Sequence, residues 1–367
     1  MSSLADRDFQ RILLIKPSSP GDIIHALPVL HGLRLRYPKA HLAWLVATPF
    51  ADIISADPSL NEVIPFDRKR YGFLGRSLRV TGEFLTFLKQ LRAKEFNLVI
   101  DLQGLFRSGF LAKASGAPTR IGFAAARELA WMFYSDCIPK CDADAHAADK
   151  NYAVATMLGF DSTPMDFTVH LTESDRAAAD NLLNSAGING PFAALVPGTR
   201  WETKCWPAER FGKVAASLHT MHGMKSILIG GKDDIPAAER AVQSSNDSAI
   251  NLCGDTTLRQ AAALIERAAL VVTADSTPMH LAAAFNRPLV ALFGPTNPAR
   301  TGPYGRMNDV LRLDLACSPC YYKKLNQCPY DHACMRDLVA ETVTTHCAVV
   351  LSDDPLKNQI IESKDRT

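Results

Sequence analysis

The sequence has 367 residues, more than one ordinary hydrophobic core organises, and this length predicts about two domains. Forty Lys and Arg residues against 38 Asp and Glu residues leave a formal net charge of +2, so no overall field favours nucleic acid as a partner. No apolar run approaches the roughly 20 residues that cross a bilayer, and the polar start MSSLADRDFQ lacks the core of a signal peptide. We therefore expect a cytoplasmic protein, whose nine cysteines are thiols or metal ligands rather than disulfides.

Short apolar runs alternate with amphipathic stretches along the chain. Helices are expected over Glu83–Lys94 in the first half and over Leu258–Ala268 in the second. The runs that suit buried parallel strands are Arg11–Lys16, His41–Ala47, Glu62–Phe66, Leu98–Leu102, Ala193–Val196, Ser226–Gly230, Leu270–Thr273 and Leu289–Phe293. This alternation predicts an α/β fold of doubly wound parallel sheets with helices on both faces.

The boundary between two such domains is expected near Thr172–Pro191. Residues Glu173–Ala186 have a helical pattern, and Gly187–Pro191 then breaks the chain. We place the boundary between residues 180 and 181, so the predicted domains are 1–180 and 181–367. Two doubly wound domains bind their ligands at strand carboxyl ends, around a shared cleft.

A Pro-Gly-Asp turn follows the first predicted strand. Gly21 allows a tight turn, and Asp22 stands where the next helix should begin. Asp is a good N-cap, which gives this carboxylate a structural explanation worth about 1 kcal/mol. The loop also lies at a strand carboxyl end, where α/β active sites form. Both roles coexist only if one carboxylate oxygen stays free to face a ligand.

Two further loops follow strands of the second half. The first carries Thr199, Arg200 and Lys204, and cations in a strand-to-helix loop neutralise phosphate oxygens. Trp206, in the same loop, is better explained by core packing. The second loop, Asp275–Thr277, brings hydroxyls and unpaired N–H groups to a helix start, which makes an anion site. Neither a GxGxxG nor a Walker sequence follows any predicted strand, which weighs against dehydrogenases and P-loop enzymes.

Taken together, these motifs resemble those of glycosyltransferase family 9, the lipopolysaccharide heptosyltransferases. The segments SSPGDIIHALPVL, DLQGLFRSG, PGTRWETKCWP, DSTPMHLAAAF and LFGPTNPARTGPYG occur in the order of that family. The resemblance extends from about Arg11 to Asp337, nearly the whole chain.

The resemblance implies the GT-B fold, in which two Rossmann-like domains face a central cleft. The N-terminal domain would bind the acceptor and the C-terminal domain the nucleotide diphosphate sugar. Transfer would invert the anomeric carbon and need neither metal nor cofactor. The expected donor is ADP-heptose and the expected acceptor an anionic glycolipid or glycan of the lipopolysaccharide core, which implies peripheral contact with the inner face of the cytoplasmic membrane.

The resemblance also assigns residues by motif. Asp22 matches the general base, and Lys204 matches the lysine on the donor phosphates. The expected donor-binding residues are Thr199, Arg200, Lys204, Gly231, Asp233, Asp275, Ser276, Thr277 and His280. The expected acceptor-binding residues are Ser19, Gly21, Arg68, Lys69, Arg70, Gln103, Arg107 and Arg127.

A cysteine cluster departs from the most familiar heptosyltransferase I enzymes, although some other members of the family carry one. Cys317, Cys320, Cys328 and Cys334 have the spacing Cys-x2-Cys-x7-Cys-x5-Cys. One CxxC pair and two more cysteines could bind structural zinc, but the other spacings do not match a standard zinc ribbon. We expect reduced thiols that pack the loop.

Two alternatives to a glycosyltransferase stay open. A nucleotide-sugar epimerase of the same fold would need no acceptor, and a non-catalytic protein would bind nucleotide sugars without turnover. The presence of both Asp22 and Lys204 argues against a decayed site.

Overall fold

The computed structural model describes residues 3–352, and the chain forms two compact units, Met1–His170 and Leu171–Thr367. The division lies between residues 170 and 171 rather than 180 and 181. The reason is helix α7 (Glu173–Ser185), which packs against α10 (Leu258–Arg267). Nε of Arg176 donates to Oε2 of Glu266 at 2.9 Å, which ties the two helices together. Residues 353–367 of the predicted second domain lie outside the described residues.

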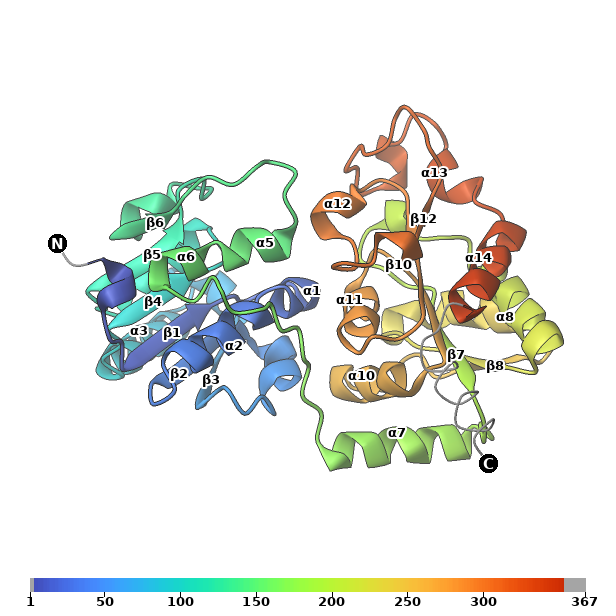
Figure 1. Ribbon diagram of the computed structural model, residues 1–367, viewed down its shortest axis with the longest axis horizontal. Helices are drawn as coiled ribbons and strands as arrows, with labels where there is room; N and C mark the ends of the chain where they lie inside the picture. The colour runs from blue at the N-terminus through green and yellow to red at the C-terminus, as the bar shows by residue number, and fades with distance from the viewer. Residues whose placement is uncertain (1–2, 353–367) are drawn as a thin grey trace. The chain divides into compact units, whose positions relative to one another are not determined.

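Each unit contains one parallel sheet with helices on both faces (Figure 1). Within the described residues the first sheet has six strands in the order β3-β2-β1-β4-β5-β6. These strands are β1 (Arg11–Ile15), β2 (His41–Ala47), β3 (Glu62–Phe66), β4 (Leu98–Asp101), β5 (Thr119–Phe123) and β6 (Asp136–Ile138). This is the doubly wound Rossmann order, as expected.

The second sheet repeats this topology, with the order β12-β11-β10-β7-β8-β9 for its six described strands. They are β7 (Phe192–Val196), β8 (Lys225–Leu228), β9 (Ala249–Asn251), β10 (Leu270–Ala274), β11 (Leu289–Phe293) and β12 (Val310–Arg312). Two Rossmann-like domains in one chain confirm the expected GT-B fold class.

Helices cover the sheets in two layers in each unit. In the first unit α2 packs against α5 and α6, while α3 packs against α4. The helices of this unit are α1 (Pro20–Ile24), α2 (Leu27–Arg36), α3 (Leu78–Ala93), α4 (Phe106–Ala114), α5 (Ala147–Tyr152) and α6 (Val154–Leu158). Its 3-10 turns are η1 (Leu4–Asp6), η2 (Thr48–Ile54), η3 (Arg70–Phe73) and η4 (Ala130–Phe133).

In the second unit α8 packs against α9 and α14, while α10 packs against α7 and α11. The helices not yet given are α8 (Ala208–His222), α9 (Ile235–Gln243), α11 (Thr277–Ala284), α12 (Pro298–Thr301), α13 (Ala333–Arg336) and α14 (Ala340–Ser352). Its 3-10 turns are η5 (Glu202–Lys204), η6 (Lys232–Asp234), η7 (Met307–Asp309) and η8 (Leu325–Gln327).

Four of the described strands were not predicted from the sequence, because they lack a long apolar run. β6, β9 and β12 have three residues each and lie at or beside the sheet edges, where no long apolar run is required. β5 carries Arg120 at its second position, which is half-exposed, so its apolar run is interrupted. The eight predicted runs are all strands: three have the predicted ends, and the ends of the other five differ by one or two residues.

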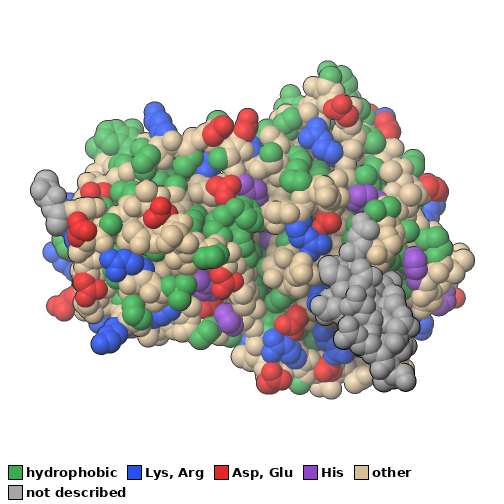
Figure 2. Space-filling model, viewed as in Figure 1, with side chains coloured by type: hydrophobic (Ala, Val, Ile, Leu, Met, Phe, Trp, Pro, Cys, Tyr) green, Lys and Arg blue, Asp and Glu red, His purple; other side chains and the backbone are tan. Residues whose placement is uncertain are grey.

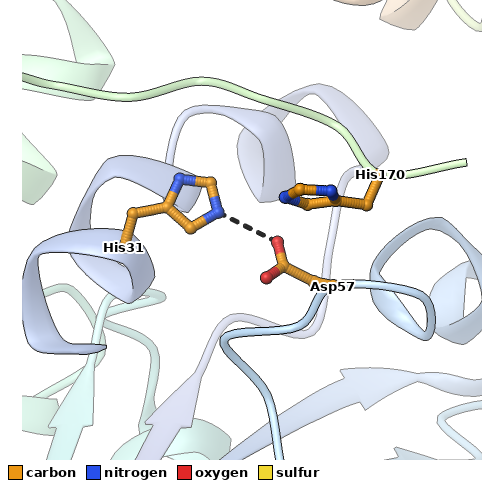
Figure 3. A group of neighbouring side chains, drawn as sticks. All are labelled: His31, Asp57 and His170. Atoms are coloured by element: carbon orange, nitrogen blue, oxygen red, sulfur yellow. Dashed lines mark hydrogen bonds and ion pairs between the residues drawn. The ribbon is translucent and has the colours of Figure 1, made fainter. Parts of the chain in front are cut away.

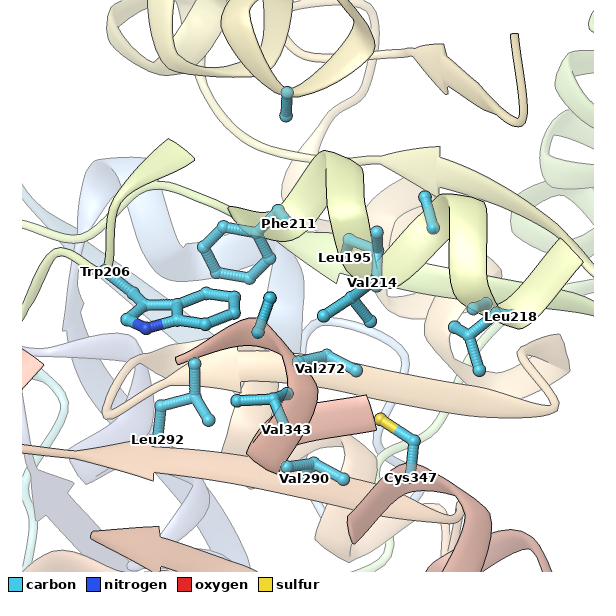
Figure 4. Close-up of a cluster of buried hydrophobic side chains, with 14 of the residues drawn as sticks. Leu195, Trp206, Phe211, Val214, Leu218, Val272, Val290, Leu292, Val343 and Cys347 are labelled. Carbon is cyan, nitrogen blue, oxygen red and sulfur yellow. The ribbon is translucent and has the colours of Figure 1, made fainter. Parts of the chain in front are cut away.

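The core of the second unit lies between its sheet and helices α8 and α14 (Figure 4). Its buried side chains include Leu195, Val272, Val290 and Leu292 from the sheet, Phe211, Val214 and Leu218 from α8, and Val343 and Cys347 from α14. Trp206 belongs to this core, as predicted: it is 2% exposed, and its indole N–H donates to the carbonyl of Leu338 at 2.8 Å.

The surface carries both signs of charge. On the face drawn in Figure 2, Lys and Arg side chains are mixed with Asp and Glu side chains, in line with the net charge of +2. No helix within residues 3–352 combines the length and the apolar character that a membrane span requires.

Gly212 of α8 lies against the backbone of α9, and replacing it tests this packing. A Cβ at Gly212 would lie 2.1 Å from the carbonyl oxygen of Ala241. Alanine favours a helix by about 1 kcal/mol, but overpacking costs typically about 1–3 kcal/mol. We expect Gly212→Ala to lower the free energy of unfolding, measured by chemical denaturation.

Gly82→Ala in α3 is the matched control, because a Cβ there meets nothing within 4 Å. It should gain about 0.5–1 kcal/mol from helix propensity alone. Equal stabilisation by both substitutions would show that α8 and α9 do not approach each other this closely.

Candidate active site

The strand order reverses at one point in each sheet, and ligand-binding loops of doubly wound domains gather there. The strands that flank this point are β1 and β4 in the first unit and β7 and β10 in the second. Four of the predicted site segments follow these strands directly: Ser19–Asp22, Gln103, Thr199–Arg200 and Asp275–Thr277.

Asp22 occupies the third position of α1 rather than its N-cap. The helix begins at Pro20, with Ser19 as the N-cap. Oδ2 of Asp22 accepts hydrogen bonds from the backbone N–H of Ser19 at 2.7 Å and from its hydroxyl at 2.8 Å. The prediction of an N-cap at Asp22 was therefore wrong, because proline suits the first helical turn and Ser19 precedes it. Oδ1 accepts neither bond, so it remains available for chemistry.

Lys16 and Asp101 lie behind this loop, and neither was among the predicted site residues. Lys16 is 8% exposed, and its ammonium donates to the carbonyl of Leu102 at 2.7 Å. Burial lowers the pKa of Lys16, while the carboxylates of Asp22 and Asp101 oppose that shift. Asp101 accepts a bond from the hydroxyl of Tyr134 at 2.7 Å, and burial raises the pKa of Asp101. The sequence did contain a signal for this contact, because Lys16 ends a run predicted to be a buried strand, and a buried lysine needs a polar or charged partner.

A cavity of about 340 Å³ opens beside the loop after β1. Three predicted acceptor-side residues, Arg68, Gln103 and Arg107, line it. The guanidinium of Arg68 donates to the hydroxyl of Ser18 at 3.3 Å, and the backbone N–H of Ser18 donates to Oε1 of Gln103 at 3.4 Å. These contacts join the loops after β1, β3 and β4 around the cavity.

The predicted basic cluster Arg68–Arg70 is divided in the structure. The guanidinium of Arg70 makes two hydrogen bonds of 2.5 Å to the carboxylate of Glu83. Lys69 is exposed at the start of η3 and is not part of the cavity wall. Of these three cations, Arg68 faces the cavity.

Arg127, Ser19 and Gly21 are likewise outside the wall of this cavity. Arg127 is exposed, and its charge lowers the pKa of Lys16, so it lies on the Lys16 side of the loop. Ser19 and Gly21 shape the first turn of α1.

A larger cavity of about 1000 Å³ lies at the carboxyl ends of β7, β8 and β10. The donor-side residues in its wall are Thr199, Arg200, Gly231, Asp233, Ser276 and Thr277. Ser276 is the N-cap of α11, but its side chain does not cap the helix; its hydroxyl hydrogen-bonds with that of Thr273 at 3.0 Å. The start of α11 therefore offers polar groups to an anion.

Lys204 and Asp275 form an ion pair that is not part of the cavity wall. The ammonium of Lys204 lies 2.6 Å from Oδ2 of Asp275 and 4.6 Å from the centre of the Trp201 ring. Thr296 donates to the same Oδ2 at 2.7 Å. Predicted donor residue His280 is buried in α11, outside the wall. Thr296 and Trp201 were missed, although both lie in motifs that the sequence analysis quoted.

Asp234 shapes the cavity wall and was also missed. Its Oδ2 accepts a hydrogen bond from the backbone N–H of Gly231 at 2.8 Å. A Cβ at Gly198 would lie 1.9 Å from Oδ1 of Asp234, and a Cβ at Gly230 would lie 2.6 Å from Oδ2. The glycines in the loops after β7 and β8 therefore make room for this carboxylate.

The four clustered cysteines line a separate cavity of about 260 Å³. All four are free thiols. Among the described residues, the cysteines do not belong to any group of His, Cys, Asp and Glu side chains whose ligand atoms are close enough to share a metal ion. Burial, together with the other three thiols of the cluster, raises the pKa of Cys334 to about 11. Metal binding by these cysteines would require the sulfur atoms to move together.

Known proteins match this chain over most of its length. The model of glycosyltransferase family 9 (heptosyltransferase) matches residues 84–331. Lipopolysaccharide heptosyltransferase 1 of Pseudomonas aeruginosa is 31% identical over 317 residues, which cover 85% of this chain and 86% of that protein.

Solved structures agree with the sequence relatives. The family 9 glycosyl transferase of Veillonella parvula has a TM-score of 0.79 at 25% identity, covering 95% of this chain and 98% of its own. E. coli heptosyltransferase WaaC with ADP-2-deoxy-2-fluoro heptose has a TM-score of 0.71 at 26% identity, covering 92% and 98%. The expected resemblance is thereby confirmed, and the chain belongs to glycosyltransferase family 9 and is a glycosyltransferase.

Proposed function

We propose that this glycosyltransferase moves heptose from ADP-heptose to a lipopolysaccharide core or a related anionic glycan. The observation that carries the proposal is the cavity of about 1000 Å³ in the second unit, which joins Arg200 to the start of α11. Cations and helix starts are the groups that bind diphosphates. The similar structure that holds ADP-2-deoxy-2-fluoro heptose supports the donor, and the P. aeruginosa relative supports the acceptor class.

The proposed reaction is a single displacement that inverts the anomeric carbon. The acceptor hydroxyl oxygen bonds to that carbon while the bond to the diphosphate oxygen breaks on the opposite face, and ADP leaves with the electron pair. Asp22 takes the hydroxyl proton on Oδ1, because Oδ2 is engaged by Ser19. General-base help of this kind is worth roughly 10²–10⁴-fold in rate.

Protein groups, rather than a metal ion, are proposed to stabilise the departing diphosphate. Lys204 would exchange the carboxylate of Asp275 for phosphate oxygens, beside the hydroxyls of Ser276 and Thr277. One aligned donor at developing charge is worth about 2.7–4 kcal/mol, against at most about 1 kcal/mol for a surface ion pair. A few aligned donors therefore suffice without a metal ion.

The smaller cavity of the first unit is proposed to hold the acceptor. Arg68 and Arg107 supply its positive charge, and Gln103 supplies a neutral polar group. This composition suits a phosphorylated or carboxylated sugar.

Contact with the inner face of the cytoplasmic membrane is proposed to place the glycolipid. Leu78 is 94% exposed at the start of α3, close in sequence to exposed Phe73 and to the basic segment Arg68–Arg70. Apolar side chains flanked by cations suit an anionic lipid surface.

A transfer assay with the wild type and Asp22→Asn tests the function and the base together. With ADP-heptose and a heptose-deficient lipopolysaccharide core, the wild type should release ADP and glycosylate the acceptor in equal amounts. The product should be inverted by NMR, and EDTA should leave the rate unchanged. Asp22→Asn should lower kcat about 10²-fold or more, with little change in donor affinity.

Thermal stability measured on the same variant separates catalysis from helix capping. A lost cap would cost about 1 kcal/mol and leave turnover nearly intact. A stable Asn variant with normal turnover would end the catalytic assignment. Isomerised donor in the absence of acceptor would instead support an epimerase, and donor binding without any turnover would support a binding protein.

Lys204→Ala tests the phosphate contact. The substitution should weaken ADP binding much more than adenosine binding in calorimetry, since the nucleoside lacks the diphosphate. Lys323→Ala is the matched control: its ammonium lies 5.0 Å from the centre of the same Trp201 ring. Equal loss of ADP and adenosine affinity in Lys204→Ala would place this lysine away from the phosphates.

Arg68→Ala tests the acceptor cavity. It should raise the KM for the acceptor, with an effect that salt weakens, and leave the KM for the donor unchanged. Arg70→Ala is the control, because Glu83 already occupies that guanidinium. A change in the donor's KM, or an equal effect of both substitutions, would contradict the assignment.

A further inference from the structure

Three side chains that are distant in sequence meet in the first unit, outside both candidate substrate cavities. His31 comes from α2, Asp57 from the loop after η2, and His170 from the last position of the unit. Figure 3 shows the two imidazole rings on either side of the Asp57 carboxylate. One potential ligand atom from each residue lies within 4.8 Å of the other two, and Nε2 of His31 is 2.9 Å from Oδ2 of Asp57.

The surroundings fix the direction of the His31 ring. Its Nδ1 lies 2.8 Å from the carbonyl oxygen of Asp166, which can only accept, so Nδ1 carries a hydrogen. The other oxygen of Asp57, Oδ1, accepts the backbone N–H of Ser59 at 2.8 Å. Metal-binding histidines typically donate the second ring N–H to a carbonyl or carboxylate in this way.

A positive charge is required between His31 and Asp57. With its hydrogen on Nδ1, a neutral His31 would point the lone pair of Nε2 at the carboxylate. The two side chains are only 8% and 2% exposed, so water does not screen this repulsion. Either a second proton or a metal ion must lie there.

We propose that Nε2 of His31, Oδ2 of Asp57 and a ring nitrogen of His170 bind a divalent transition-metal ion of the Zn²⁺ class. Two imidazoles and one carboxylate form a ligand set that zinc accepts, with water in the fourth position. His170 is half-buried and leaves access for the ion and its water.

The distances suit this ion after small movements. Zinc bonds to nitrogen and oxygen of about 2.0–2.1 Å in a tetrahedron place ligand atoms about 3.3 Å apart. The 2.9 Å pair needs to open by a few tenths of an ångström, and His170 needs to approach by at most about 1.5 Å, a distance that side-chain rotation covers.

The proposed ion would hold the end of the first unit in place. The segment from Asp161 to His170 contains no helix or strand, and it ends the first unit. A metal would fix its last residue to α2 and to the loop after η2. A metal at this place does not contradict metal-independent transfer, because none of the three ligands lines a substrate cavity.

Cobalt(II) titration of the tag-free, chelator-treated full-length protein tests the proposal. Cobalt bound to nitrogen and oxygen gives visible d–d bands, and cobalt bound to thiolate adds an intense charge-transfer band in the near ultraviolet. We expect one equivalent with d–d bands only, zinc displacing it, and zinc raising the melting temperature. Asp57→Asn and His170→Ala should each weaken binding at least about tenfold.

Cys317→Ser/Cys320→Ser is the matched control, because it removes the CxxC pair and leaves the proposed ligands intact. Its binding should equal that of the wild type. His170→Gln, checked by circular dichroism, guards against loss of fold in the alanine variant. The proposal is overturned by absence of binding, by equal binding in the folded His170 variants, or by a charge-transfer band that the cysteine variant abolishes.

Discussion

The constraint on which both candidate sites depend is the parallel pairing of β1 with β4 and of β7 with β10. The pairing places Ile15 beside Asp101. Lys16, the residue after β1, can therefore donate to the carbonyl of Leu102, the residue after β4. In the second unit Val196 is level with Thr273, so the Gly198 loop and Asp275 leave the sheet at one height. In doubly wound sheets, ligands bind outside the carboxyl ends of the strands at this reversal of strand order.

The Lys204–Asp275 pair connects this geometry to the chemistry of the donor. Breaking a buried ion pair by removing one partner costs about 3–5 kcal/mol, so Lys204 can leave only for an anion of at least equal strength. A diphosphate meets that requirement and a neutral nucleoside does not. When Lys204 moves, the hydroxyl of Thr296 continues to donate to Asp275, which lowers the cost of the exchange. Under the proposed function, the pair would therefore hold the ammonium of Lys204 in place until a charged ligand binds.

The fold and much of the site could be predicted from sequence, because both follow from local patterns. Apolar runs located eight strands, and loops after strands located Asp22, Arg200 and Ser276. The remaining features depend on contacts between distant segments, which periodicity does not encode. Asp234 fills space left by glycines in two loops, and His31 meets Asp57 and Asp166 only through the tertiary fold. The helix start was misplaced by a few residues because the capping chemistry of Asp and Ser is similar.

The role proposed for Asp22 as general base is compatible with its structural contacts. Its two oxygens are divided: Oδ2 closes the first turn of α1 on Ser19, and this contact fixes the direction of Oδ1. A carboxylate held in this way loses less rotational entropy when substrate binds, which is the advantage that preorganised sites have over mobile ones. Behind this loop, the buried ammonium of Lys16 donates to the carbonyl of Leu102. The structural contact is therefore part of the proposed catalytic role, and capping alone does not account for a lysine buried at this position.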